Sequence, residues 1–440
     1  MPWRGWYSRL QANGLHLAAA NSGWLLFDKL ARALLGLLVG AWVARYLGPA
    51  QFGVLAYVIA FIALFQAVAN LSNDAIVVRD ITQDRSAAPE ILGTLLAMRV
   101  SAGVVCWAAV VASVAFFSPG DRQVLWMTVV VGGVLVFQAA DSVDLWFQSQ
   151  SQSRRTVVAK LSAYLVSSGM KVLLILANAP LEAFAFVTAF DALASAGGLW
   201  VAYRHMPTSS AWRRFAPRAH SLLAESWPFI LSGVSIAAYS RVDQILVKQL
   251  LGDRSLGIYA AALPLAQFWQ VIPVILATSL APFIARFKQA DEAGYRRALV
   301  LVFRAFFYLG VAIAMVTFAV SDLLVRLLFG AEFAEAAGVL NVLGIANVFC
   351  FLGIAHGLWL VNEKRFAVRL YGTLLASFVA VALNFALLPR VGIIGAAWAA
   401  TAAQLVAAFL INLLLDRQSF RMQIEAIFFR KTQTRVEGNR

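Results

Sequence analysis

Residues 251–260 read LGDRSLGIYA, and residues 47–56, which lie 204 positions upstream, read LGPAQFGVLA. In both stretches, two glycines five positions apart mark a tight turn between two apolar runs. At the same offset, Gln66 aligns with Gln270. The offset is close to half of the 440-residue chain, which predicts two related halves that each open with the same hairpin. Internal repeats of this size are common in transporters.

The composition indicates that this chain lies in a lipid bilayer and not in water. Hydrophobic residues make up 61% of the sequence, charged residues make up 13%, and the mean hydropathy is +0.76. A soluble chain averages about 45–50% apolar and about 25% charged residues. The sequence therefore predicts an all-α integral membrane protein.

Twelve apolar stretches are long enough to cross a bilayer, which takes about 20 residues. They are predicted at 24–45, 53–75, 92–117, 123–147, 157–177, 183–203, 226–250, 256–285, 298–320, 336–361, 367–388 and 393–415. Six stretches fall in each half. We expect two six-helix lobes, 1–210 and 211–440, the second with a cytoplasmic tail.

The basic residues between these stretches predict the orientation of the chain. Twenty-four arginines and lysines lie in the termini and alternate connections, against five in the other connections. Positive charge collects on the cytoplasmic side of membrane proteins, so both termini are expected there. The same asymmetry accounts for the net charge of +14 without a nucleic-acid partner.

Ionisable residues at membrane depth are costly and are functional candidates by default. The first predicted helix carries Asp28, Lys29 and Arg32. Asp28 and Arg32 are four positions apart and can pair on one helix face, whereas Lys29 points elsewhere. The alternative is that all three side chains reach toward the cytoplasmic end of the helix.

Two polar stripes follow helical spacing. One comprises Gln66, Asn70, Asn73 and Asp74, and the other comprises Gln138, Asp141, Asp144 and Gln148. Such stripes either join helices or line a wet cavity. Asp141 and Asp144 lie about one helical turn apart, so each can raise the proton affinity of the other. Alternatively, they form salt bridges with Arg154 or Arg155.

The seventh predicted helix carries Arg241 and Asp243. Residues two positions apart lie on different faces of a helix, so each is expected to contact a different partner. Further membrane-embedded ionisable residues are Lys171, Asp191 and Arg304. The sequence contains no phosphate-binding loop, metal-ligand spacing or catalytic triad pattern. We therefore expect neither a cofactor nor a metal, and no enzyme activity.

Several stretches together resemble the polysaccharide biosynthesis family, the flippases of O-antigen and other lipid-linked oligosaccharides, from about residue 21 to 412. The multidrug/oligosaccharidyl-lipid/polysaccharide exporter superfamily to which they belong also contains multidrug exporters and the lipid II flippase. The stretches that carry the resemblance are 241–262 with Pro273, Ser279 and Pro282, the first hairpin at 44–53, 144–148, and 392–397. The family has twelve helices, as counted here. The sequence departs from the family in its fourth helix, where Asp141 and Asp144 form a pair and either one could match the usual acid.

The resemblance implies a bacterial inner-membrane flippase that moves an undecaprenyl-pyrophosphate-linked glycan to the outer leaflet by alternating access. Membrane lipids and other polysaccharide assembly proteins would be its partners. A cationic, polar cavity between the lobes would hold the headgroup, with Lys29, Arg32 and Arg241 as anion partners. The expected polar contacts are Gln66, Asn70 and Gln270, and the expected ion-coupling residues are Asp141, Asp144 and Asp243.

Two other functions remain open. A multidrug or small-metabolite antiporter of the same superfamily would favour acids that attract cationic drugs, whereas the candidates here are mixed and include arginines. A membrane-embedded polysaccharide polymerase or ligase would show a long external loop with catalytic Arg or His residues. The sequence predicts only short turns on that side.

Overall fold

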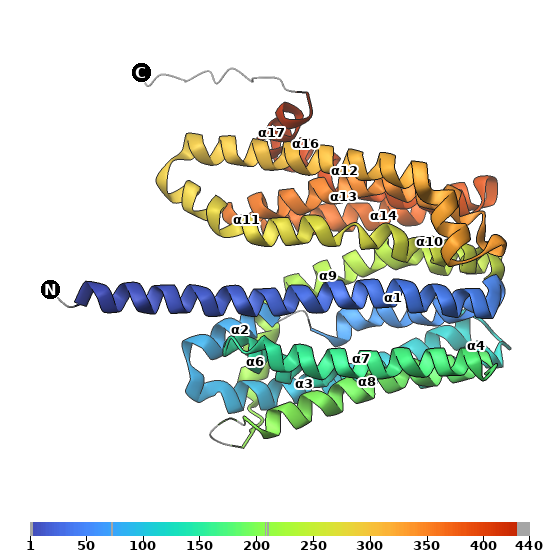
Figure 1. The fold of residues 1–440 in the computed structure, drawn as a ribbon, viewed down its shortest axis with the longest axis horizontal. Coiled ribbons are helices and arrows are strands. Elements are labelled where there is room, and N and C mark those ends of the chain that lie inside the picture. Colours follow the sequence, from blue (N-terminus) through green and yellow to red (C-terminus); the bar gives the residue numbers. More distant parts are fainter. Residues whose placement is uncertain (1–2, 72–73, 207, 209–210, 429–440) are drawn as a thin grey trace. The chain divides into compact units, whose positions relative to one another are not determined.

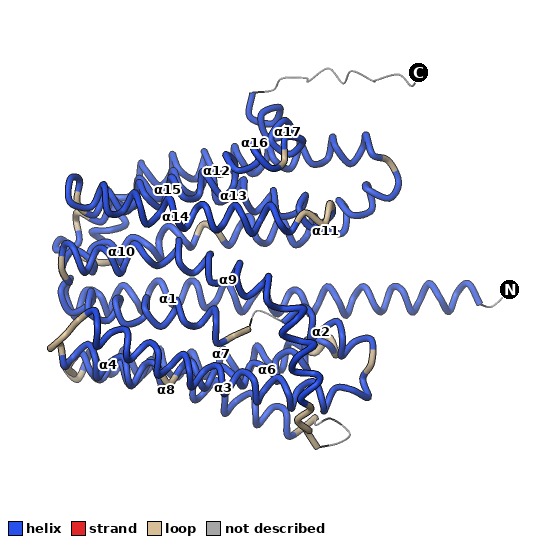
Figure 2. Tube along the Cα trace, turned by 180° about the vertical axis from the view of Figure 1, so that it is seen from behind, coloured by secondary structure: helices blue, strands red, loops and turns tan. Residues whose placement is uncertain are grey.

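The computed structural model describes residues 3–71, 74–206, 208 and 211–428, and those residues form helices with no strand (Figures 1 and 2). Contacts divide the chain into unit 1, Met1–Ala237, and unit 2, Ala238–Arg440. Helix α9, Ala216–Leu251, runs from the first unit into the second. The division between 210 and 211 expected from the sequence falls in the connection before α9, and it stays a prediction.

Unit 1 contains eight helices before α9, and its fourth predicted span is interrupted. Short helices and one 3₁₀ turn replace the continuous helix expected at 123–147. The helices are α1 (Trp3–Ala69), α2 (Asp74–Gln83), α3 (Ala88–Phe117), α4 (Arg122–Gly132), α5 (Val134–Phe137), α6 (Asp141–Ser149), α7 (Ser153–Leu176) and α8 (Leu181–Arg204), with 3₁₀ turns at Arg85–Ala87 and Gln138–Ala140.

Unit 2 continues from α9 with eight further helices. The last predicted span contains a π-helical turn at Val406–Leu410, and a short helix follows it. The helices are α10 (Asp253–Phe268), α11 (Val271–Ala290), α12 (Glu292–Leu328), α13 (Ala336–Asn362), α14 (Phe366–Val391), α15 (Ile393–Leu405), α16 (Ile411–Leu415) and α17 (Arg417–Phe428), with a 3₁₀ turn at Ala331–Phe333.

In the described part of the chain, eleven helical stretches are long and apolar enough to cross a membrane. The first stretch, Gly23–Ala69, counts as one helix although its backbone is kinked at Gly48. It contains the predicted span 24–45 and most of the predicted span 53–75. Counted as two crossings, it brings the total to the predicted twelve. The protein is therefore a multi-pass, all-α membrane protein.

The repeated turns have the same backbone conformation in both units. Gly48 has φ 70° and ψ 169°, and Gly252 has φ 86° and ψ 175°. This region is essentially restricted to glycine, because a Cβ atom would clash with the backbone there. Each turn is a single non-helical residue between two helices. The repeat found in the sequence thus corresponds to two hairpins of matching geometry.

The prediction of one helix over 53–75 is wrong at its carboxyl end. Helix α1 ends at Ala69, Leu71 has φ 58°, and α2 begins at Asp74. Gln66 and Asn70 therefore lie at the end of one helix and Asp74 at the start of another, so they do not form a single stripe. Asn73 lies outside the described residues.

Close helix packing within each unit depends on small residues, as is usual where lipid replaces water. A Cβ atom added to Gly103 would lie 2.3 Å from the carbonyl oxygen of Leu135, and one added to Gly310 would lie 2.9 Å from the Cα of Val348. Large apolar side chains such as Phe116 and Phe318 are exposed, as expected of a surface that faces acyl chains.

The connection between α8 and α9 is fixed to unit 1. The backbone N–H of Arg213 donates to the carbonyl oxygen of Pro89 at 3.1 Å. From α2, Arg79 pairs with Glu225 of α9 at 2.9 Å, and Asp80 pairs with Arg218 at 2.7 Å. The hydrogen bonds of Arg79 to Glu225 and Asp80 raise the pKa of its guanidinium above the ordinary value. The first part of α9 is therefore anchored to α2.

Candidate functional site

One face of α7 carries a line of polar side chains through unit 1. Lys160, Tyr164, Ser167 and Lys171 follow one another at intervals of four, three and four residues, which places them on the same side of the helix. Helix α7 packs against α1, α6 and α8. We call these four residues the α7 polar face.

Lys160 of the α7 polar face binds both aspartates of the fourth span. Its Nζ lies 2.7 Å from Asp141 Oδ1 and 2.9 Å from Asp144 Oδ2. The sequence offered Arg154 or Arg155 as salt-bridge partners, but the partner that the structure places here is Lys160. The other oxygen of Asp144, Oδ1, is buried and has no hydrogen-bond partner among the described residues.

Arg32 of α1 lies beside the middle of this face. Its Nε donates to Asp28 Oδ1 at 2.8 Å, which confirms the predicted pairing of these two residues. The guanidinium also lies 5.2 Å above the centre of the Tyr164 ring, a cation–π arrangement. Lys29, by contrast, is exposed and has no ion pair or hydrogen bond within the described part of the chain.

The remaining charges of unit 1 lie further along α7. Ser167 Oγ donates to Asp191 Oδ1 of α8 at 2.8 Å, and Lys171 follows one helical turn later. The sequence named Lys171 and Asp191 only as membrane-embedded residues, and the structure brings Asp191 to the α7 polar face. Acids and bases therefore occur together along this face, and most of its charge is balanced within unit 1.

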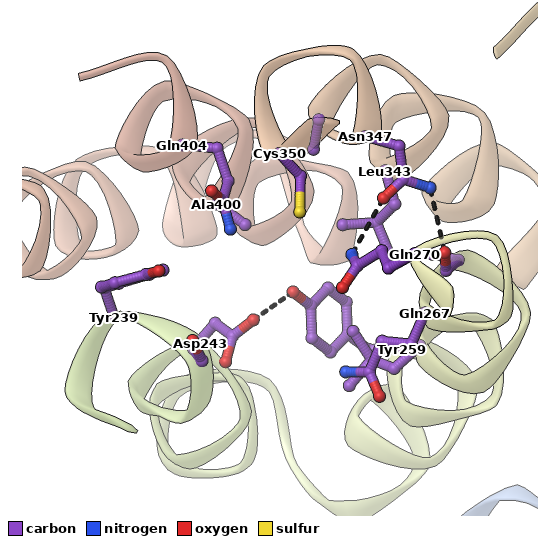
Figure 3. A pocket seen from close by; sticks show the side chains of 14 residues that line it. Tyr239, Asp243, Tyr259, Gln267, Gln270, Leu343, Asn347, Cys350, Ala400 and Gln404 are labelled. Atoms are coloured by element: carbon purple, nitrogen blue, oxygen red, sulfur yellow. Dashed lines mark hydrogen bonds between the residues drawn. The ribbon is translucent and has the colours of Figure 1, made fainter. Parts of the chain in front are cut away.

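Unit 2 contains a partly open cavity of about 110 Å³ that is lined by several polar side chains (Figure 3). This volume is sufficient for several water molecules. The lining side chains come from α9, α10, α13 and α15, with Gln270 between α10 and α11. They include Tyr239, Asp243, Tyr259, Gln267, Gln270, Asn347, Cys350 and Gln404.

Among the described residues that line this cavity, Asp243 is the only acidic one, and 4% of its surface is exposed. It accepts a hydrogen bond from the Tyr259 hydroxyl, and the backbone N–H of Gln244 donates to its Oδ1 at 2.8 Å. Among the described residues, no lysine, arginine or histidine forms an ion pair with it. The buried carboxyl group of Asp243 is thus held by hydrogen bonds, and Arg241 acts on it only through its charge, from beyond the distance of an ion pair.

A second hydrogen-bond chain crosses the cavity. Gln270 Nε2 donates to Asn347 Oδ1 at 2.9 Å, and Asn347 Nδ2 donates to the carbonyl oxygen of Ala266 at 2.9 Å (Figure 3). The structure therefore brings two predicted site residues, Asp243 and Gln270, into one cavity. Gln66, which aligns with Gln270 in the repeat, and Asn70 form no side-chain hydrogen bond with any described residue.

Arg241 lies half-buried on α9, two residues before Asp243, and does not line the cavity. Its guanidinium forms neither a hydrogen bond nor an ion pair with any described residue. Among the three cations predicted to contact an anion, Arg32 is neutralised by Asp28, whereas Lys29 and Arg241 keep their hydrogen-bonding capacity.

Sequence reasoning missed two partners at these sites, Lys160 and Tyr259. Lys160 is one of the basic residues whose distribution predicts the orientation, and its position in the sequence does not point to the two aspartates. Asp243 and Tyr259 lie nine residues before and seven residues after Gly252, so a hairpin closed at this glycine places them opposite each other. That spacing was a usable signal. The described residues contain no group of three His, Cys, Asp or Glu side chains that could hold a metal ion.

Comparison with solved structures identifies the fold. The inward-facing conformation of a multidrug resistance MATE family transporter of the MOP superfamily gives a TM-score of 0.69 at 13% identity, covering 90% of this chain and 96% of that one. The lipid II flippase MurJ, in an inward closed conformation, gives 0.66 at 12% identity, covering 93% and 91%. A MOP superfamily transporter from Pyrococcus furiosus gives 0.64 at 14% identity, covering 93% and 96%. These relatives are transporters and flippases, not enzymes.

Sequence comparison identifies the family. The capsular polysaccharide biosynthesis protein CapF of Staphylococcus aureus is 24% identical over 185 residues, which cover 41% of this chain and 46% of that protein. The chain thus matches less than half the length of this relative. A model of the MatE family matches residues 228–386, and a model described as polysaccharide biosynthesis protein matches residues 18–288. Because the latter match covers more than half of the sequence, this chain belongs to the polysaccharide biosynthesis protein family.

Proposed function

We propose that this protein flips an undecaprenyl-pyrophosphate-linked oligosaccharide, such as an O-antigen repeat unit, from the cytoplasmic to the outer leaflet by alternating access. The family and the flippase fold support transport of a lipid-linked glycan. The observation that carries the proposal is the state of Arg241, a half-buried arginine in a membrane span whose guanidinium forms no hydrogen bond or ion pair with any described residue and acts on Asp243 only through its charge.

An arginine at membrane depth is retained at considerable cost, and such residues usually pair with another charge or face a substrate pathway. A guanidinium group presents a planar set of donors that matches the oxygens of a phosphate. Arg241 is therefore proposed to contact the pyrophosphate during transport. Lys29 is proposed as a second phosphate contact, and Arg32 contributes only when its bond to Asp28 opens.

One-way transport of an anionic headgroup requires a source of free energy, and the sequence has no nucleotide-binding loop. The proposed coupling residues are Asp141, Asp144 and Asp243. Protonation of Asp141 or Asp144 would break an ion pair to Lys160, whereas Asp243 can gain a proton without breaking one. We therefore expect Asp243→Asn to reduce the response of transport to a pH gradient more than Asp141→Asn does, in proteoliposomes that carry each variant.

The proposed location is the bacterial inner membrane, with both termini in the cytoplasm. The distribution of arginine and lysine along the sequence supports this orientation. Other polysaccharide assembly proteins are the proposed partners. A reporter fused after Arg435 should be cytoplasmic and one fused after Asp121 should be external; the reverse result would overturn the orientation.

The central experiment measures flipping of a pyrophosphate-linked glycolipid in proteoliposomes. Loss of a hydrogen bond to a charged group costs about 1.5–3 kcal/mol, so Arg241→Ala should slow flipping about 10- to 100-fold. Arg241→Lys should be affected less, because it keeps the charge but loses the planar donors. Arg286→Ala, which removes an exposed arginine of α11, is the matched control and should flip at the parental rate. Parental flipping by Arg241→Ala would remove the main support of the proposal.

A second candidate is a multidrug or small-metabolite antiporter. Asp243 favours it, because a buried acid without an ion pair can attract a cation, and the MatE match spans this region. The same proteoliposomes distinguish the two functions. Uptake of a cationic dye that depends on Asp243 but not on Arg241 supports the antiporter, and glycolipid flipping that depends on Arg241 supports the flippase.

A further inference from the structure

A groove of about 590 Å³ runs along the surface of unit 1 between α7 and α8. Its walls are apolar for most of its length, and two arginines stand at one end. The lining residues are Arg154, Arg155, Val158, Ala159, Ser162, Gly198, Val201 and Ala202. None of them belongs to the α7 polar face, so this is a separate feature of the unit.

Small side chains create the groove. A Cβ atom added to Gly198 would lie 3.3 Å from the carbonyl oxygen of Ala159, so the two helices approach closely at this level. Ser162 donates its hydroxyl back to the same carbonyl at 2.9 Å and therefore adds little width to its helix. Val158 and Val201 are 54% and 57% exposed and form the two edges. The result is an apolar furrow open to lipid.

The end of the groove is strongly cationic. Arg154 and Arg155 lie in the first turn of α7, and neither guanidinium group donates a hydrogen bond to any described residue. The guanidinium of Arg154 lies 5.3 Å from the centre of the Trp24 ring. This contact orients the guanidinium through its flat face and leaves the N–H groups at its edge available to an anion. The amino-terminal end of α7 adds partial positive charge, which also favours an anion.

From this arrangement we propose that the groove binds one anionic phospholipid. An acyl chain lies along Val158, Ala159 and Val201, and the phosphate accepts hydrogen bonds from Arg154 and Arg155. A free phosphate ion would use the arginines but not the apolar walls, whereas a zwitterionic lipid would use the walls and gain less from the arginines. The two parts of the groove together select a lipid with net negative charge. This site does not depend on which substrate the protein moves.

The test is native mass spectrometry of the full chain in detergent, titrated with phosphatidylglycerol or phosphatidylethanolamine. Each arginine near a membrane surface strengthens the binding of anionic lipid about fivefold, so the parent should hold one phosphatidylglycerol about 30-fold more tightly than phosphatidylethanolamine. Arg154→Gln with Arg155→Gln should remove most of this preference. Arg417→Gln with Arg421→Gln, which removes an exposed basic pair from α17, is the matched control and should keep it.

A second arm tests the apolar part of the groove. Ser162→Phe fills the furrow and should weaken the binding of both lipids at this site, whereas Val166→Phe, at an exposed position of α7 outside the groove, should not. Ala202→Leu fills the furrow from the other helix and serves if Ser162→Phe does not fold. Unchanged preference in the double arginine variant, unchanged binding in both groove-filling variants, or displacement of the lipid by millimolar inorganic phosphate would each overturn the proposal. Because the readout is binding, it is independent of whether the protein flips glycolipids.

Discussion

The α7 polar face in unit 1 and the cavity in unit 2 place acids in the membrane in two different ways. In unit 1, Asp141 and Asp144 share Lys160, and Asp28 is paired with Arg32. In unit 2, Asp243 is held by a tyrosine hydroxyl and a backbone N–H. The halves therefore keep a common hairpin geometry while their buried charges have diverged.

This difference has a physical consequence. Removing one member of a buried ion pair leaves an uncompensated charge, so the pairs of unit 1 tie its helices together. A carboxyl group held by hydrogen bonds can change its protonation state and keep a hydrogen bond to the same neighbour. Unit 1 is thus suited to rigidity, and the cavity of unit 2 is suited to a change of charge.

The largest expected effect on stability comes from removing one charged group, and it should differ between the two units. Lys160→Met leaves two carboxylates unpaired and should destabilise the protein by about 3 kcal/mol, the lower end of the range for broken buried pairs, because 38% of the Asp141 side chain is exposed. Asp243→Asn keeps an acceptor for Tyr259 and should cost less than about 1 kcal/mol. Reversible unfolding in mixed micelles measures both.

The control for the lysine variant is its combination with Asp141→Asn and Asp144→Asn, which removes the uncompensated charges and should recover most of the lost stability. The comparison between the units fails if Asp243→Asn destabilises the protein as much as Lys160→Met does, because the carboxylate charge of Asp243 would then be as necessary for stability as the ion pairs of unit 1.

A medium effect is expected from one hydroxyl group in each unit. Tyr259→Phe removes a donor from the buried Asp243 and should cost about 1–3 kcal/mol. Tyr164→Phe keeps the ring under Arg32 and should change stability by less than about 0.5 kcal/mol. The same unfolding assay applies. Equal effects would show that the hydroxyl of Tyr164 also has a structural role.

The smallest expected effect compares the two glutamines that align in the repeat. Gln270→Ala leaves the buried Asn347 without one partner and should cost about 1 kcal/mol. Gln66→Ala removes no side-chain hydrogen bond seen among the described residues and should cost less than half as much. A larger loss of stability for Gln66→Ala would indicate that Gln66 makes an interaction equivalent to the hydrogen bond between Gln270 and Asn347.

Much of the fold could be predicted from the sequence, because hydropathy and helix length follow directly from a lipid solvent. The twelve crossings and the repeated turn at Gly48 and Gly252 needed no tertiary information. The end of the helix at Ala69 was missed because a polar stripe can continue past a helix end at regular spacing. In the fourth span, the 3₁₀ turn at Gln138–Ala140 left no hydropathy signal.

The sites were harder to predict because partners across helices depend on packing. The pairing of Asp28 with Arg32 was predictable because it lies within one helix. Lys160 comes from the next helix along the chain, and only the approach of α6 to α7 selects it over Arg154 and Arg155. The roles assigned to Lys29, Arg241, Gln66, Asn70 and Gln270, and to the three coupling aspartates, stay predictions.

The hairpins at Gly48 and Gly252 also determine where the chain can be cut or tagged. Proteases nick exposed loop tips, and inserted epitopes are tolerated at such tips. Each of these hairpins closes with one non-helical residue. It therefore contains no extended segment that a protease could bind and no loop that could accommodate an inserted tag. Limited digestion should therefore leave both hairpins intact, and an epitope placed there would unwind the adjoining helices before it could be recognised.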